Sequence, residues 1–141
     1  MHKNEVEISI DWPLPAVSTF VTRIENDLQW LGAVTGAEQT GEGEPTVGTV
    51  EWMKLSHLGW KFDVDLEVIE YDPERAFAVR STSGLLPFTA RWSFEEDGSG
   101  TKFRYSIELK SGMFGIFGMY KRNMKSHLKA LKELLEKGEA A

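Results

Sequence analysis

The sequence contains no cysteine, which excludes disulfide bonds, thiolate metal sites and thiol catalysis. Histidine is scarce: the chain has three, His2, His57 and His127, and no two of them have the spacing of metal ligands on a helix. The glycine-rich stretch Gly112–Gly118 lacks the Lys-Ser/Thr ending of a phosphate-binding loop. We therefore expect no metal site and no cofactor.

Long apolar runs are missing as well. No stretch approaches the roughly 18 apolar residues that a membrane-spanning helix needs, so we expect no stable membrane insertion. Met1 to Ile10 is charged and alternating and lacks the apolar core of a signal peptide, which favours a cytoplasmic location. The net charge of −6 gives no long-range attraction to phosphate backbones, so we expect no nucleic-acid partner.

The size and composition predict one folded domain over residues 1–141. Hydrophobic residues make up 41% and charged residues 27% of the chain, a globular balance. A chain of this length buries a core without disulfides or metals.

Much of the chain alternates between apolar and polar residues, the pattern of half-buried strands. Turn residues separate the strands, as in Leu58-Gly59, Asp72-Pro73-Glu74 and Asp97–Gly100, so consecutive strands pair as an antiparallel meander. Apolar residues at helical spacing predict two short helices after the first strand, over 15–23 and 25–31. The predicted strands cover 4–11, 34–40, 49–56, 60–68, 76–81, 88–95 and 102–109.

The last segment changes to a helical period. One apolar stripe predicts a helix from about Phe114 to Lys137, with Lys and Glu on the opposite faces. The Gly112–Gly118 stretch at its start has three readings: a flexible apolar entry to the helix, a hinged lip on a pocket, or a membrane contact. The stripe consists of Met113, Phe117, Tyr120, Met124, Leu128, Leu131 and Leu135.

The helix stripe and the apolar face of the sheet each need a cover, and the simplest solution is that they cover each other. A twisted sheet of six or seven strands is wider than one helix, so it curls around it. Large aromatic rings dominate the inner face, and curling around one helix tends to leave space for a ligand.

The order of these elements resembles the START/Bet v 1-like superfamily, also called SRPBCC or polyketide cyclase/dehydrase-like. Matching local features are Pro13–Phe20, Val47-Gly48-Thr49, Val68–Pro73 and Gly98–Thr101. The resemblance implies an α+β helix-grip fold: a curved antiparallel sheet wrapped around a long C-terminal helix. Members of this superfamily bind lipids, sterols, polyketides, quinones or plant hormones, and some are cyclases or dehydratases.

The resemblance and the aromatic inner face together predict binding or transport of a hydrophobic small molecule in a cavity between the sheet and the helix. An enzyme of the cyclase or dehydratase type, or an interaction module whose pocket is filled by its own side chains, is the alternative. The oligomeric state stays open. The expected pocket lining is Trp60, Phe62, Val64, Phe77, Val79, Phe88, Trp92, Phe94, Phe103, Tyr105, Met113, Phe117, Tyr120 and Met124.

Catalysis would need a titratable side chain inside the pocket. The inward polar candidates are Tyr105, Tyr120 and Ser81, with His57 at a strand end, and no set of them identifies a catalytic residue. Alternation points charged residues of the meander outward, namely Asp63, Asp65, Glu67, Arg91 and Glu108.

The register of strand 49–56 has two solutions. A two-residue turn at Leu58-Gly59 pairs His57 with Trp60 and places Met53 and Leu55 inside, whereas a three-residue turn places Trp52 inside and brings Lys54 with it.

Overall fold

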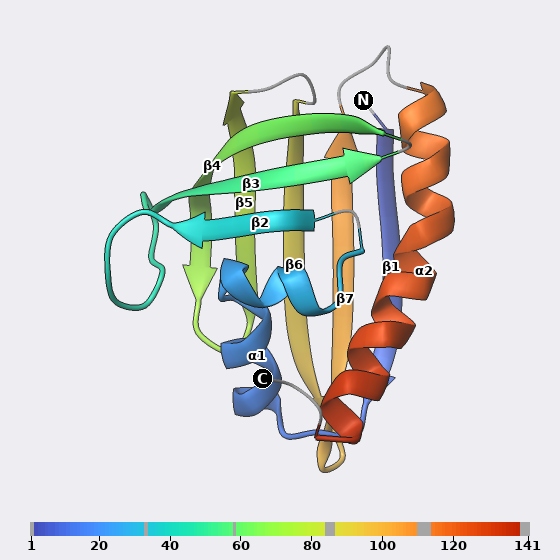
Figure 1. The fold of residues 1–141 in the computed structure, drawn as a ribbon. Coiled ribbons are helices and arrows are strands. Elements are labelled where there is room, and N and C mark those ends of the chain that lie inside the picture. Colours follow the sequence, from blue (N-terminus) through green and yellow to red (C-terminus); the bar gives the residue numbers. More distant parts are fainter. Residues whose placement is uncertain (1, 33, 58, 84–86, 110–113, 139–141) are drawn as a thin grey trace.

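The computed structural model describes residues 2–32, 34–57, 59–83, 87–109 and 114–138, with all their side chains except those of 2–4, 57, 60 and 114–123. The described chain forms one antiparallel sheet, two short helices and one long helix (Figure 1). The strands are β1 (His2–Ile10), β2 (Val34–Gln39), β3 (Val50–His57), β4 (Trp60–Asp72), β5 (Ala76–Ser83), β6 (Phe88–Asp97) and β7 (Gly100–Leu109). The helices are α1 (Leu14–Val21), the 3-10 helix η1 (Ile24–Gln29) and α2 (Phe114–Glu136).

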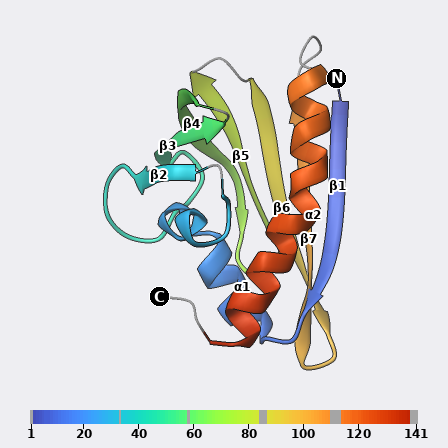
Figure 2. The same cartoon turned by 45° about the vertical axis from the view of Figure 1, so that its right-hand side comes forward.

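The strand order is β1-β7-β6-β5-β4-β3-β2. Strands β2 to β7 follow one another as the predicted meander, and β1 joins the free edge of β7. β1 and β2 are therefore the two edges of a half-barrel. Figure 2 shows the curl, with β2 and β3 nearly end-on while β1 runs along the page.

Two irregularities in the pairing of β4 with β5 help the sheet to bend. The pairing of β4 with β5 shifts between Asp65 and Leu66 and again between Val68 and Glu70. Each shift leaves an extra residue in one strand, which increases local twist and bends the strand. Ile69 is the extra residue of the second shift, and its side chain is turned out of the core.

The hairpin between β3 and β4 settles the register. His57 pairs with Trp60, and Gly59 has φ of +83°, the left-handed conformation that a two-residue hairpin turn requires. Met53 is therefore buried and Lys54 is exposed, with its Nζ 5.9 Å from the centre of the Trp52 ring on the outer face. The two-residue turn is confirmed, and it leaves Lys54 outside the core.

The long helix covers the sheet from the side of β1. Met124, Leu128, Leu131 and Leu135 of the predicted stripe are all buried in the same apolar cluster as the inner face of the sheet. The C-terminal end of α2 lies toward α1 in both views (Figures 1 and 2).

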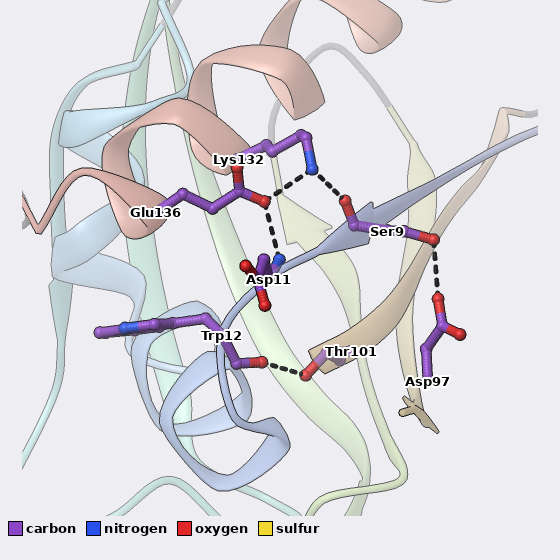
Figure 3. Close-up of polar contacts among 7 residues, drawn as sticks. All are labelled: Ser9, Asp11, Trp12, Asp97, Thr101, Lys132 and Glu136. Atoms are coloured by element: carbon purple, nitrogen blue, oxygen red, sulfur yellow. Dashed lines mark hydrogen bonds and ion pairs between the residues drawn. The ribbon is translucent and has the colours of Figure 1, made fainter. Parts of the chain in front are cut away.

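A group of polar contacts fixes this end of α2 to the sheet (Figure 3). Lys132 Nζ donates to the carbonyl of Ser9 at 2.7 Å and to Glu136 Oε2 at 2.6 Å, and the backbone N–H of Asp11 donates to the same carboxylate at 2.7 Å. On the other side of β1, Thr101 Oγ1 donates to the carbonyl of Trp12 at 2.8 Å. The C-terminal end of α2 is thus tied to the end of β1, and the segment that leads into α1 is tied to β7.

The predicted helix-grip fold is confirmed, with seven strands. The element boundaries lie within two residues of the sequence prediction, except at the end of β4. The second short helix is a 3-10 helix that begins at Ile24, and β4 continues past Val68 to Asp72 because its bulge lets the strand follow the curve of the sheet. No helix of the described residues is long and apolar enough to cross a membrane.

Candidate functional site

Aromatic rings line the core-facing side of β5, β6 and β7. The Trp92 ring lies 5.2 Å from Tyr105 and 5.6 Å from Phe77, measured between ring centres. Phe94 and Phe103 stack at 5.5 Å, and Trp30, which follows η1, meets Phe103 edge-on at 6.3 Å. Trp30 therefore reaches the sheet from the helical side and borders the same interior.

The structure brings most of the expected lining residues to this interior. Phe62 and Phe88 are half-buried at core-facing positions of β4 and β6. Met113 and the side chains of Trp60, Phe117 and Tyr120 lie outside the described part of the chain. The buried members are Val64, Phe77, Val79, Trp92, Phe94, Phe103, Tyr105 and, on α2, Met124.

A glutamate occupies one core-facing position. Glu51 lies on β3 two residues before Met53, so it shares the inner face of the strand. It stands opposite Gln39 of β2 and Leu66 of β4. Only 1% of Glu51 is exposed. A carboxyl group thus replaces an apolar side chain in the wall of the half-barrel.

A second acid meets it from the helical layer. Asp27 of η1 is three residues after Ile24 and three before Trp30, and all three are buried. Three-residue spacing places side chains on one face of a 3-10 helix, so Asp27 is carried inward with its apolar neighbours. Only 3% of Asp27 is exposed.

Glu51 is close enough to Asp27 to shift its pKa, and we call the two residues the acid pair. Burial raises the pKa of Asp27 well above its ordinary value, and the neighbouring carboxylates of Glu51 and Glu25 raise it further. Burial, helped by Glu25, raises the pKa of Glu51 to about 8. Glu51 therefore favours the protonated form near neutral pH, and Asp27 keeps its proton to a higher pH than a solvated aspartate does.

Glu25 connects the pair to the edge strand. Its Oε2 accepts the backbone N–H of Gln39 at 2.9 Å, and Gln39 is the residue opposite Glu51. Since Glu25 is exposed while Asp27 and Glu51 are buried, the three acids run from the surface to the interior.

Several buried polar atoms here have no hydrogen-bond partner within the part of the chain that the structure describes. They are Asp27 Oδ1, Glu51 Oε2 and the indole nitrogens of Trp30 and Trp92. The Trp30 indole is near enough to Asp27 to lower its pKa in part, but the geometry falls short of a hydrogen bond. Native interiors leave few such atoms unsatisfied, so each one calls for a partner.

The polar candidates from the sequence have other roles or lie outside the described part. Ser81 Oγ accepts the backbone N–H of Phe88 at 2.9 Å, a contact that joins β5 to β6. The side chains of His57 and Tyr120 are outside the described part. His127, considered only as a metal ligand, is half-buried on α2 beside Gly32, and burial lowers its pKa.

Neither member of the acid pair was predicted from the sequence, although a signal existed for Glu51. The register that places Met53 and Leu55 inside also places Glu51 inside, because strand positions alternate. Asp27 had a weaker signal, its spacing from Ile24 and Trp30. The outward charges were predicted correctly: Arg80 pairs with Glu67 and Arg91 with Glu70 on the outer face.

A separate surface groove of about 590 Å³ lies beside the β4–β5 turn. Charged side chains from the turn and from β6 and β7 line it, including Arg75, Glu95 and Lys102, and only Leu14 and Phe94 reach it from the core. It is too polar to suit an apolar ligand, and neither acid of the pair borders it. Among the described residues, no three His, Asp or Glu side chains converge in the manner of a metal site.

Comparisons with known proteins agree with this architecture. A family model described as "Polyketide cyclase / dehydrase and lipid transport" matches residues 1–136. No curated protein matches the chain in sequence.

Three solved structures illustrate the shared fold. The di-domain aromatase/cyclase BexL from the BE-7585A biosynthetic pathway superimposes with a TM-score of 0.77 at 18% identity, over 96% of this chain and 47% of that one. The Aha1 dimer from Colwellia psychrerythraea gives 0.73 at 16% identity, over 96% and 97% of the two chains. Ara h 8.0201 gives 0.70 at 16% identity, over 94% and 95%. At these identities the likeness shows the fold alone.

Proposed function

Because the chain belongs to the polyketide cyclase/dehydrase and lipid transport family, we propose that it binds an apolar small molecule between the core-facing side of its sheet and α2. The ligand class is a lipid, polyketide, quinone or similar aromatic compound. Binding or transport is the role, and the protein works in the cytoplasm without nucleic acid.

The unsatisfied polar atoms on an otherwise apolar inner face carry this proposal. A core packed for stability alone would place apolar side chains at Asp27 and Glu51, because an unpaired buried carboxyl costs several kcal/mol, on the order of 2 to 7. Apolar walls with a few convergent polar groups are the usual composition of a small-molecule site. Phe103 and Trp92 supply the apolar wall, and the acid pair supplies the polar groups.

The proposed lining combines the sheet and the helix. From the sheet we assign Trp60, Phe62, Val64, Phe77, Val79, Phe88, Trp92, Phe94, Phe103 and Tyr105, and from α2 and the segment before it Met113, Phe117, Tyr120 and Met124. These side chains would enclose a ring-containing molecule.

The acid pair also favours a second candidate, an enzyme of the cyclase or dehydratase type. Such chemistry uses a general acid that holds its proton near neutral pH inside an apolar site. Glu51, with its pKa raised to about 8, has that property. Turnover of a bound ligand that is lost in Glu51→Gln but retained in Glu38→Gln, which alters an exposed acid of β2, would support the enzyme.

Native mass spectrometry of the protein purified from its expression host tests the binding proposal. A mass excess that disappears on denaturation would support a bound apolar molecule, and its mass would begin the identification. No excess, combined with no thermal shift across fatty acids, sterols, quinones and flavonoids, would contradict the proposal and favour a pocket filled by the protein's own side chains.

A space-filling variant separates an open pocket from a filled one. Val79 is buried at a core-facing position of β5. In an open pocket, Val79→Phe occupies ligand space, so binding falls while the melting temperature is kept. In a filled core the extra volume is overpacked and costs about 1 to 3 kcal/mol of stability. Val50→Phe on the exposed outer face of β3 is the matched control.

A further inference from the structure

We propose that the acid pair, Asp27 and Glu51, together with the Trp30 indole, is the polar anchor of the ligand site. It binds the carbonyl or hydroxyl oxygen of an uncharged apolar molecule and rejects ligands that carry a carboxylate or another anion. The inference rests on the function proposed above and adds the chemical class of the ligand.

The pair is built into the interior by two unrelated elements. Glu51 arrives through the alternation of β3, and Asp27 arrives through the turn of η1. Both are almost completely buried, and each has an oxygen without a hydrogen-bond partner among the described residues. An ion pair would have neutralised them, but within the described residues the charged neighbours that shift the pKa of either acid, in either direction, are other acids.

At least one proton stays on the pair. Two neighbouring carboxyl groups in a medium of low dielectric constant cannot both ionise without strong mutual repulsion. The protonated member is an O–H donor, and the Trp30 indole, also buried and unpartnered, is an N–H donor beside it. A carbonyl oxygen has two lone pairs and can accept from both donors.

An anionic ligand meets the opposite situation. Burying its charge in an apolar interior costs free energy unless a cation pairs with it, and the charged neighbours that shift the pKa of the acid pair are acids. The Trp30 donor alone cannot offset that cost. The anchor therefore selects ketones, quinones or phenols over fatty-acid anions of similar size.

The residues around Glu51 determine how ligand binding responds to pH. Glu25 of η1 is exposed and adds negative charge, while the residues opposite Glu51 on β2 and β4, Gln39 and Leu66, are uncharged. On α2, His127 packs beside Gly32, and burial lowers its pKa, so it stays neutral near neutral pH. Raising the pH through the titration of Glu51 therefore removes a donor and adds a charge.

Two naphthalene probes test the selectivity. One is the neutral ketone 6-propionyl-2-(dimethylamino)naphthalene, and the other is the anion 6-(p-toluidino)-2-naphthalenesulfonate. Fluorescence titrations at pH 6 and pH 9 measure the Kd of each for the wild type and for Glu51→Gln, Glu51→Met and the exposed control Glu38→Gln. Circular dichroism confirms that each variant is folded.

We expect the wild type to bind the ketone about tenfold or more tightly than the anion at pH 6. Tenfold is the change in affinity that one good hydrogen bond typically gives. The ketone affinity should fall about tenfold by pH 9. Glu51→Gln keeps an N–H donor and carries no charge, so its ketone affinity should depend on pH less than that of the wild type does. Glu51→Met keeps the length of the side chain but has no donor, so its affinity for the ketone at pH 6 should be about tenfold lower than that of the wild type.

The alternative outcomes separate the two proposals. Equal binding of both probes, unchanged in Glu51→Met, would leave the binding function standing and overturn the anchor. Ketone affinity that rises between pH 6 and pH 9 would also overturn it. Binding of neither probe would overturn both proposals. If Glu51→Met does not fold, the pH profiles of Glu51→Gln and the wild type decide the result.

Discussion

Replacing Glu51 by glutamine should stabilise the protein at alkaline pH. The buried carboxyl holds its proton more tightly in the folded state than in the unfolded chain, so folding favours the protonated form. Stability is therefore greatest below the ordinary pKa and falls as the pH rises toward the folded pKa of about 8. Glutamine has nearly the same shape and never ionises, so it removes this loss.

The magnitude follows from the shift. A rise in pKa from 4.5 to about 8 corresponds to about 5 kcal/mol in total, at about 1.4 kcal/mol per pKa unit. Between pH 5 and pH 8 the wild type should lose roughly 3 to 4 kcal/mol more than Glu51→Gln does. That difference is a large part of the roughly 5 to 15 kcal/mol that stabilises a typical domain.

Urea unfolding at pH 5, 6, 7 and 8 measures the free energy of unfolding directly. The stability difference between Glu51→Gln and the wild type should grow with pH at up to about 1.4 kcal/mol per unit. Glu38→Gln, at an exposed position on β2, should give a difference that does not grow. Parallel pH curves for Glu51→Gln and the wild type would refute the view that Glu51 is a buried acid with a raised pKa.

Three further predictions concern the fold and are checked by urea unfolding at neutral pH. Phe103→Ala should cost about 3 to 5 kcal/mol, because the ring is fully buried and contacts two other rings, whereas Ile69→Ala on the exposed bulge should cost less than about 1 kcal/mol. Gly100→Ala should cost about 1 to 3 kcal/mol, because a Cβ there would lie 2.5 Å from a backbone carbonyl oxygen of β1. Ser99→Ala, next to it, should leave the stability unchanged. Equal stability of the two variants would contradict the close approach. Lys132→Met should cost about 1 kcal/mol, because it loses its hydrogen bond to β1, and an unchanged free energy would show that this contact does not stabilise the helix end.

The acid pair shows where prediction from the sequence stopped. Its members are 24 positions apart in the chain, on a 3-10 helix and on a strand, and neither lies in a motif. Alternation alone could have assigned Glu51 to the inner face once Met53 was placed there. That Asp27 meets it depends on how η1 packs against β2, and no local pattern encodes that packing.

The local patterns of the sequence were sufficient for the elements and for the fold class. Period-two alternation identified the strands, and the apolar stripe identified α2, because these periods follow directly from backbone geometry. Short turns imposed the meander, and the need to cover two apolar faces brought sheet and helix together.

The tertiary structure alone decided which polar groups share the interior. The hairpin register turned Lys54 outward and Glu51 inward, and the irregularities in the pairing of β4 with β5 help the sheet to bend. Contacts between distant segments depend on packing across the whole domain, which no window of the sequence contains. The chemistry proposed here comes from that packing: two acids brought together without a counter-charge in the described interior retain a proton that neither would hold alone in water.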